Sequence, residues 1–133
     1  MKKPILAIIL SLCFVSFMPH AKVTAKKASC PIYLYASNQA GTSVRFYRIT
    51  WYSSGSNYSQ VVNLNNGQST LVSTYVDASN EISVQVANGT FNNVTIEDAN
   101  GQVLYSLPYD GSNIYWFYNV QFTNCYTNTV VLH

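Results

Sequence analysis

The residues that could carry out catalysis in this chain are few. Its two histidines are His20 and His133. A Ser-His-Asp or Cys-His arrangement would therefore depend on the last residue, in a terminus that we expect to be mobile. The shortage of histidine also removes the usual ligands of zinc. We predict no nucleophilic catalytic site and no metal site.

Carboxylate pairs are the remaining catalytic option, because glycosidases use two of them at a set separation. Glu97 and Asp98 are adjacent, and neighbouring residues of a strand point to opposite faces. The stretch Asp98–Gly101 begins like a calcium loop, but its sixth and twelfth positions are Val103 and Tyr109 instead of Gly and Glu. We therefore expect a non-enzymatic protein without a cofactor. The acids all lie at or beside predicted turns, where carboxylates are normally solvated: Asp77, Glu81, Glu97, Asp98 and Asp110.

The first 25 residues are typical of a secretory signal peptide. A basic start precedes an apolar run, Ile5–Met18, and the small-residue pattern Val23-Thr24-Ala25 then offers a cleavage site. The mature domain would span residues 26–133, with cleavage after Ala21 as the alternative. We therefore predict a secreted protein, extracellular or periplasmic.

The apolar run is shorter than the ~20 residues that a membrane span needs, and no later segment approaches that length. We expect no membrane span in the mature chain. A lipid anchor on Cys13 is the less favoured alternative, since Leu12 stands where a lipoprotein signal has a small residue.

Removing the leader also changes the charge of the protein. The whole chain carries a formal net charge of +2, but Lys2, Lys3 and Lys22 belong to the leader. The formal net charge of the mature domain is close to −1, because it has one more acidic residue than it has Lys and Arg residues together. Nucleic-acid binding needs clustered cations, so we predict no nucleic-acid partner.

Cysteine usage agrees with export. Cys30 and Cys125 are the cysteines of the mature domain, and a pair in an exported chain predicts a disulfide. A redox role is the alternative, but the two cysteines lack CxxC spacing and a basic neighbour.

The body of the chain has the pattern of short strands separated by turns. Glu81–Ala87 alternates apolar and polar residues with the period of a half-buried strand. Asn-Gly and Asp-Gly dipeptides mark tight turns. We predict a single-domain, all-β antiparallel sandwich of eight to nine strands. The expected strands are Pro31–Ala36, Ser43–Ser53, Ser59–Leu64, Ser69–Val76, Glu81–Ala87, Asn92–Asp98, Gln102–Leu107, Asn113–Thr123 and Tyr126–Leu132.

The facing of two strands decides which rings are available for binding. In Asn113–Thr123 the even positions are all apolar, which predicts that Trp116 lies in the core. In Ser43–Ser53 neither alternation is cleanly apolar, so the sequence leaves its buried face open, and a bulge that reverses the facing midway would account for the pattern. The expected core comprises Ile82, Val84, Val86, Val94, Ile96, Trp116, Val120 and Phe122.

The outward rings define the predicted binding site. Tyr and Trp offer rigid contact area, and neighbouring amides and hydroxyls offer hydrogen bonds. This mixture suits a glycan or a protein surface. An assembly subunit, which would bury the rings against another chain, is the alternative, and ordinary strand tyrosines explain outward rings without any ligand. The predicted ligand-binding residues are Tyr33, Tyr35, Tyr115, Phe117 and Asn119, with the first and eighth strands as neighbours.

Overall fold

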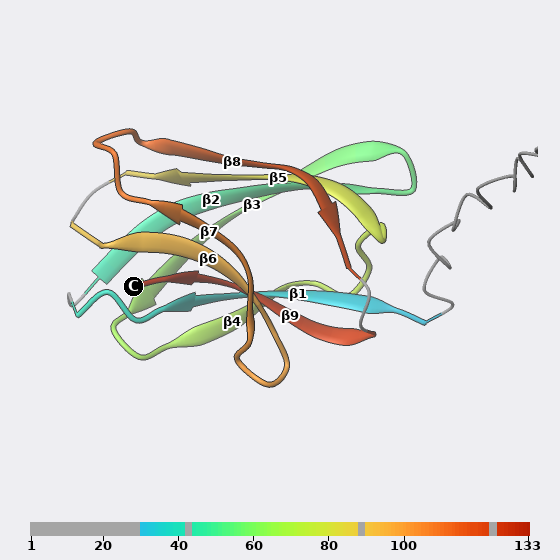
Figure 1. Ribbon diagram of the computed structural model, residues 1–133, viewed down its shortest axis with the longest axis horizontal. Coiled ribbons are helices and arrows are strands. Elements are labelled where there is room, and N and C mark those ends of the chain that lie inside the picture. The colour runs from blue at the N-terminus through green and yellow to red at the C-terminus, as the bar shows by residue number, and fades with distance from the viewer. Residues whose placement is uncertain (1–29, 42–43, 88–89, 123–124) are drawn as a thin grey trace, which may run out of the picture.

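The computed structural model describes residues 30–41, 44–87, 90–122 and 125–133. The predicted signal peptide lies outside these residues. Within the described ranges the chain forms nine strands (Figure 1), and no apolar helix of membrane-spanning length is present there. The strands are β1 (Ile32–Asn38), β2 (Val44–Ser53), β3 (Ser56–Asn65), β4 (Ser69–Ser73), β5 (Ser79–Val86), β6 (Asn93–Asp98), β7 (Val103–Pro108), β8 (Ile114–Gln121) and β9 (Tyr126–Leu132).

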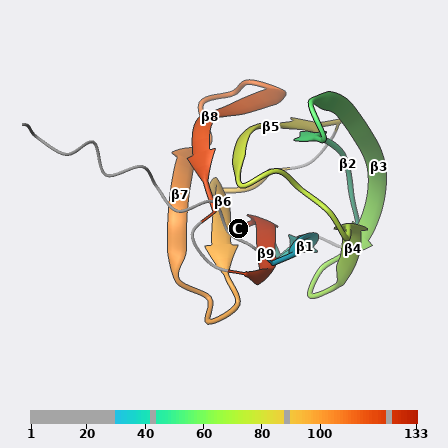
Figure 2. The ribbon, with the colours of Figure 1, turned by 90° about the vertical axis from the view of Figure 1, so that its right-hand side faces the viewer.

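The strands form two sheets that face each other, as the end-on view in Figure 2 shows. The five-stranded sheet has the order β4-β1-β9-β6-β7, and the four-stranded sheet has the order β3-β2-β5-β8. The predicted all-β sandwich is confirmed. The expectation that the first and eighth strands are neighbours is wrong, because β1 and β8 belong to different sheets.

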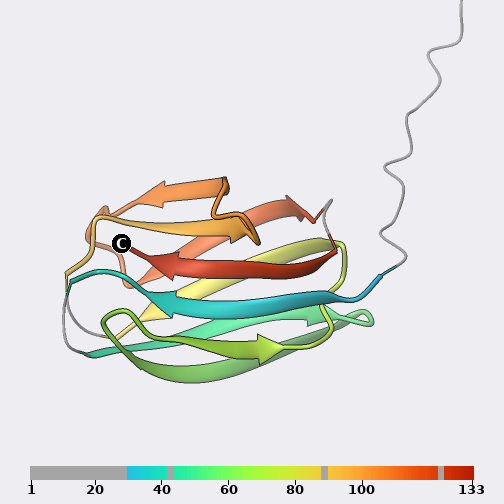
Figure 3. The same cartoon turned by 90° about the horizontal axis from the view of Figure 1, so that it is seen from below.

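The two ends of the domain meet inside the five-stranded sheet. β1 and β9 pair in parallel from Ile32 opposite Tyr126 to Asn38 opposite Leu132 (Figure 3). The predicted disulfide is present and joins Cys30 to Cys125 just before these strands, with 5.6 Å between their Cα atoms. The other strand pairs of the described residues are antiparallel. Parallel strands need a long connection, which here is almost the whole domain.

The core lies between the sheets and is apolar. Seven of the expected core residues are buried: Ile82, Val84, Val86, Val94, Ile96, Val120 and Phe122. Tyr47 is completely buried, and its hydroxyl donates to the Ser37 carbonyl at 3.2 Å, which connects β2 with β1. Burial raises the pKa of Tyr47 well above its usual value. The hydroxyl therefore stays neutral and can keep donating.

Strand β8 faces the opposite way from the prediction over its first half. Tyr115 and Phe117 are 3% and 4% exposed, whereas Trp116 is 47% exposed. The register explains why Tyr115 and Phe117 lie in the core, because they pair with the buried residues Val84 and Ile82. The predictions of a buried Trp116 and of outward Tyr115 and Phe117 are therefore wrong.

A bulge explains why the second half of β8 was predicted correctly. Between the pairs Asn80–Val120 and Ile82–Phe117, β8 has one residue more than β5. Asn119 takes up the extra length with a φ of 55°, a conformation that Asn tolerates better than most residues. The bulge reverses the alternation, so Phe117 and Val120 both face the core.

Strand β2 is regular and has no bulge, which settles the facing that the sequence left open. Its register with β3 runs without a shift from Val44 to Ser53, and Tyr47, Ile49 and Trp51 are all buried. The Asn80 side chain fixes the end of the strand: its amide donates to the Tyr52 carbonyl, and its oxygen accepts from the Tyr52 N–H, both at 2.9 Å.

The reversed facing of β8 predicts opposite effects for two neighbouring substitutions. Phe117→Ala should lower the free energy of unfolding by about 3–5 kcal/mol, because it leaves a cavity in the core. Trp116→Ala should change it by less than about 1 kcal/mol, because surface substitutions have small effects. Chemical denaturation of both variants tests this, and the reverse order of stabilities would contradict the structure.

The disulfide should contribute strongly, because it spans 95 residues of sequence. A Cys30→Ser, Cys125→Ser double variant should lose about 2–5 kcal/mol of unfolding free energy, chiefly because its unfolded chain gains freedom. Thermal unfolding of the variant and the oxidised parent gives the difference. Equal stabilities would show that β1 and β9 hold together without the bond.

Candidate binding face

Three exposed, mostly aromatic side chains lie along β8, one of the two edge strands of the four-stranded sheet. On β8, Ile114, Trp116 and Tyr118 are 40%, 47% and 60% exposed and share the outer side. We call these three residues the β8 stripe. The Trp116 and Tyr118 rings are nearly parallel, with 9° between their planes and 5.9 Å between their centroids. The stripe thus presents two aligned rings and one aliphatic side chain to solvent.

Short hydroxyl side chains continue from Trp116 across the sheet. The register places Trp116 opposite Ser83, Ser83 opposite Thr50, and Thr50 opposite Ser59. We call Ser83, Thr50 and Ser59 the hydroxyl row. Ser83 is buried under its neighbours, while Thr50 is half-buried and Ser59 is exposed. Large side chains are therefore absent from the line that runs from Trp116 to β3.

Longer polar side chains flank the hydroxyl row. On one side, Gln85 lies opposite both Ile114 and Arg48, and both Gln85 and Arg48 are exposed. On the other side, the bulge places Tyr118 and Asn119 opposite the exposed Glu81. The face thus combines rings, amides, hydroxyls and one charge of each sign. These groups can bind a neutral polar ligand through stacking and hydrogen bonds.

The predicted site residues are divided between the two sheets. Tyr33 and Tyr35 lie half-buried on the outer side of β1, and Tyr33 contacts the exposed Tyr126 ring with 6.3 Å between centroids. Asn119 is exposed at the bulge, next to the β8 stripe. The structure therefore does not bring the five predicted residues together.

The β8 stripe was missed because both alternations of that strand are rich in apolar residues. The available signal was Asn119, a polar residue that accepts a positive φ and separates two apolar stretches. Placing a bulge at that position would have moved Trp116 outward while keeping Val120 inward.

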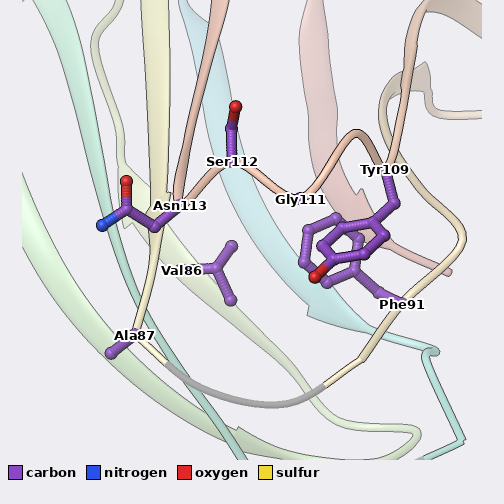
Figure 4. Close-up of a pocket in the computed structure, with 7 residues that line it drawn as sticks. All are labelled: Val86, Ala87, Phe91, Tyr109, Gly111, Ser112 and Asn113. Atoms are coloured by element: carbon purple, nitrogen blue, oxygen red, sulfur yellow. The ribbon is translucent and has the colours of Figure 1, made fainter.

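A cavity of about 160 Å³ opens at the end of the sandwich where β8 begins. Figure 4 shows the Phe91 and Tyr109 rings and the Val86 side chain beside it, with the Ser112 hydroxyl pointing away from the rings. Phe91 packs edge-on against Tyr109, and their centroids are 5.0 Å apart. The lining residues are uncharged: Val86, Ala87, Phe91, Tyr109, Gly111, Ser112 and Asn113.

Hydrogen bonds shape the loop beside this cavity. The Ser112 N–H donates to the Asp110 carboxylate at 2.9 Å and lowers the pKa of that carboxyl. The Tyr115 hydroxyl donates to the Ser112 carbonyl at 2.9 Å, and desolvation raises the pKa of Tyr115. At neutral pH the Asp110 carboxyl is therefore ionised and can accept, and the Tyr115 hydroxyl is neutral and can donate. These hydrogen bonds hold the loop that forms the cavity wall.

A cluster around His133 has the residue types of a catalytic triad but a different geometry. The His133 Nε2 atom lies 3.0 Å from Thr95 Oγ1 and 2.8 Å from Glu97 Oε1. In a triad the nucleophile and the acid contact different ring nitrogens, whereas here both contact the same one. The terminus that we expected to be mobile is hydrogen-bonded to β6: the backbone N–H of His133 donates to the Asn93 carbonyl at 3.0 Å. No metal-binding group of acids, histidines and cysteines occurs among the described residues.

Comparison of the chain with family models, curated proteins and solved structures finds no match.

Replacing Asn119 tests the bulge, because this residue holds the positive φ there. Asn119→Val should lower the free energy of unfolding by about 1–3 kcal/mol, because a β-branched residue is strained at positive φ. Asn119→Gly, the matched control, accepts that φ without strain and should stay close to the parent. Denaturant titrations measure both values, and a Val variant as stable as the Gly variant would argue against the bulge.

Proposed function

We propose that the protein is an exported, non-catalytic binding domain whose outer four-stranded face binds a glycan. The Cys30–Cys125 disulfide is consistent with an oxidising compartment outside the cytoplasm. The observation that carries the choice of ligand is the pair of aligned, exposed rings of Trp116 and Tyr118 beside the hydroxyl row.

A sugar ring has the two kinds of surface that this face can bind. Its C–H face can stack on an aromatic ring, and its hydroxyls can exchange hydrogen bonds with amides and hydroxyls. In this proposal a sugar ring packs against the free surface of the stacked Trp116 and Tyr118 rings, while Gln85, Arg48 and Thr50 contact hydroxyls. The low charge of the face favours a neutral glycan over an acidic one.

Loss of Trp116 tests the proposal. Trp116→Ala should weaken glycan binding by about 30-fold, since truncating a central aromatic contact costs about 2 kcal/mol. Tyr126→Ala, which removes an exposed ring from the other sheet, is the matched control and should bind like the parent. A glycan array identifies the sugar, and calorimetry measures the affinities. Equal binding by Trp116→Ala and the parent would contradict the proposed face.

An assembly role is the second candidate, and Ile114 favours it. Ile114 is 40% exposed beside Trp116, and Val61 is 41% exposed on the same face. Aliphatic side chains do not stack on sugars and gain free energy when a protein surface covers them. A dimer in light scattering that Ile114→Ser converts to a monomer would support this role, and a monomeric parent would contradict it.

A further inference from the structure

The edge strand β3 differs from the other three edge strands of the described domain (Figure 2). β4, β7 and β8 each carry a register shift against the strand with which they pair, and such bulges hinder the addition of a further strand. β3 instead pairs with β2 over ten residues without a shift. It therefore presents a regular edge to solvent.

The sequence of β3 also lacks the residues that usually protect an edge. It is SNYSQVVNLN, which contains no charged residue and no Pro, the two common ways of keeping a second strand away. All of its residues except Val62 and Leu64 are exposed. Nothing in the composition of β3 therefore opposes an added strand.

The hairpin that begins β3 fixes which of its main-chain groups are free. Ser53 and Ser56 close a two-residue loop with positive φ, and the closing pair of such a loop exchanges both main-chain hydrogen bonds. Because bonded and non-bonded pairs alternate along an antiparallel ladder, every second residue of β3 directs its N–H and C=O away from β2. These residues are Asn57, Ser59, Val61, Asn63 and Asn65.

Asn65 agrees with this assignment and already has its partners. Its N–H donates to Gln68 Oε1 at 3.0 Å, and its carbonyl accepts from the Gln68 N–H at 3.1 Å. Nowhere in the described part of the chain is there a partner for the outward main-chain groups of the other four residues. The free groups of the edge are therefore distributed evenly on the two sides of Gln60.

We propose that β3 pairs with β3 of a second copy of this chain, antiparallel and about a two-fold axis at Gln60. In this register Asn57 lies opposite Asn63 of the partner subunit, and Ser59 lies opposite Val61 of the partner subunit. Each of these pairs exchanges both of its main-chain hydrogen bonds. The pairing therefore uses every free main-chain group of the edge and leaves none without a partner.

The symmetry of the free groups is the reason for choosing a second copy as the occupant. A two-fold interface requires the same patch on both subunits, and the capping of Asn65 by Gln68 is what makes the free set symmetric about Gln60. The absence of charge in β3 means that no like charges face each other across the axis, where they would destabilise the pair.

The dimer would have one continuous sheet, made of two four-stranded sheets joined through β3. A two-fold axis through an antiparallel pair is perpendicular to the sheet, so both outer faces lie on the same side, with a β8 stripe at each end. Two such faces could bind one glycan chain together and gain avidity. The dimer itself does not depend on the glycan proposal, because it uses the opposite edge of the sheet.

Charges placed at the axis test the partner and the register together. Gln60 is exposed, so Gln60→Lys and Gln60→Glu should both fold, but each places two like charges opposite each other. In sedimentation experiments the parent should be a reversible dimer, and each variant should have a dimer dissociation constant about 10-fold higher or more. An equimolar mixture of the two variants should form dimers again. Ile114→Ser, on the opposite edge strand, is the control and should stay dimeric.

A second pair of variants tests the main-chain hydrogen bonds. Val61→Pro removes an N–H that points away from β2, a change that an edge strand tolerates, and it should dissociate the dimer. Val61→Ala keeps the N–H and should stay dimeric. Near-UV circular dichroism of both variants checks that the domain is folded.

A parent that stays monomeric into the high micromolar range would overturn the proposal and leave the edge to a strand of another protein. A dimer that both Gln60 variants retain, or that Ile114→Ser dissociates, would place the contact on another surface and also overturn it. A mixture of Gln60→Lys and Gln60→Glu that stays monomeric would exclude Gln60 from the axis.

Discussion

The left-handed backbone at Asn119 is the constraint on which the proposed binding face depends. With a φ of 55° at that residue, β8 accommodates one residue more than β5 between two paired positions. The side chains before the bulge then change sides relative to those after it. Phe117 and Val120 can both fill the core, and Trp116 and Tyr118 are left outside. Without the bulge, Phe117 and Val120 would point to opposite sides of the sheet, and one of them would be lost from the core.

The rest of the sandwich supports this arrangement from the opposite layer. The parallel β1–β9 pair, tied by the Cys30–Cys125 disulfide, joins the ends of the domain within the five-stranded sheet. The Tyr105 hydroxyl of β7 accepts from the Gln121 N–H at the end of β8. This bond satisfies a donor on an edge strand and connects the two sheets beyond the bulge. The position of the edge strand is therefore fixed close to the point where its facing changes.

Much of the fold could be predicted from local features of the sequence. The alternation in Glu81–Ala87 and the Asn-Gly turns fixed strand positions to within a few residues, and Gly67 and Gly101 do adopt positive φ. The disulfide followed from the number of cysteines together with the predicted signal peptide. Each of these features depends on a few neighbouring residues or on composition alone, so each can be predicted without knowing which strands pair.

The site could not be predicted in the same way, because it depends on pairing across the fold. Either alternation of β8 is apolar enough to face a core, and only its register with β5 selects Tyr115 and Phe117. The pairing of β1 with β9 joins residues almost a whole domain apart, and no local pattern indicates it. The Trp51 N–H, which has no hydrogen-bond partner among the described residues, likewise becomes visible only when its surroundings are known.

Solvent access to Trp116 tests the account most directly. In a Trp51→Phe variant Trp116 is the only tryptophan, so its fluorescence reports on one side of β8 alone. The account predicts emission at long wavelength and strong quenching by acrylamide, because the indole is 47% exposed. Blue-shifted emission with weak quenching in the folded variant would place Trp116 in the core. That result would contradict the bulge, the facing of β8 and the proposed binding face together.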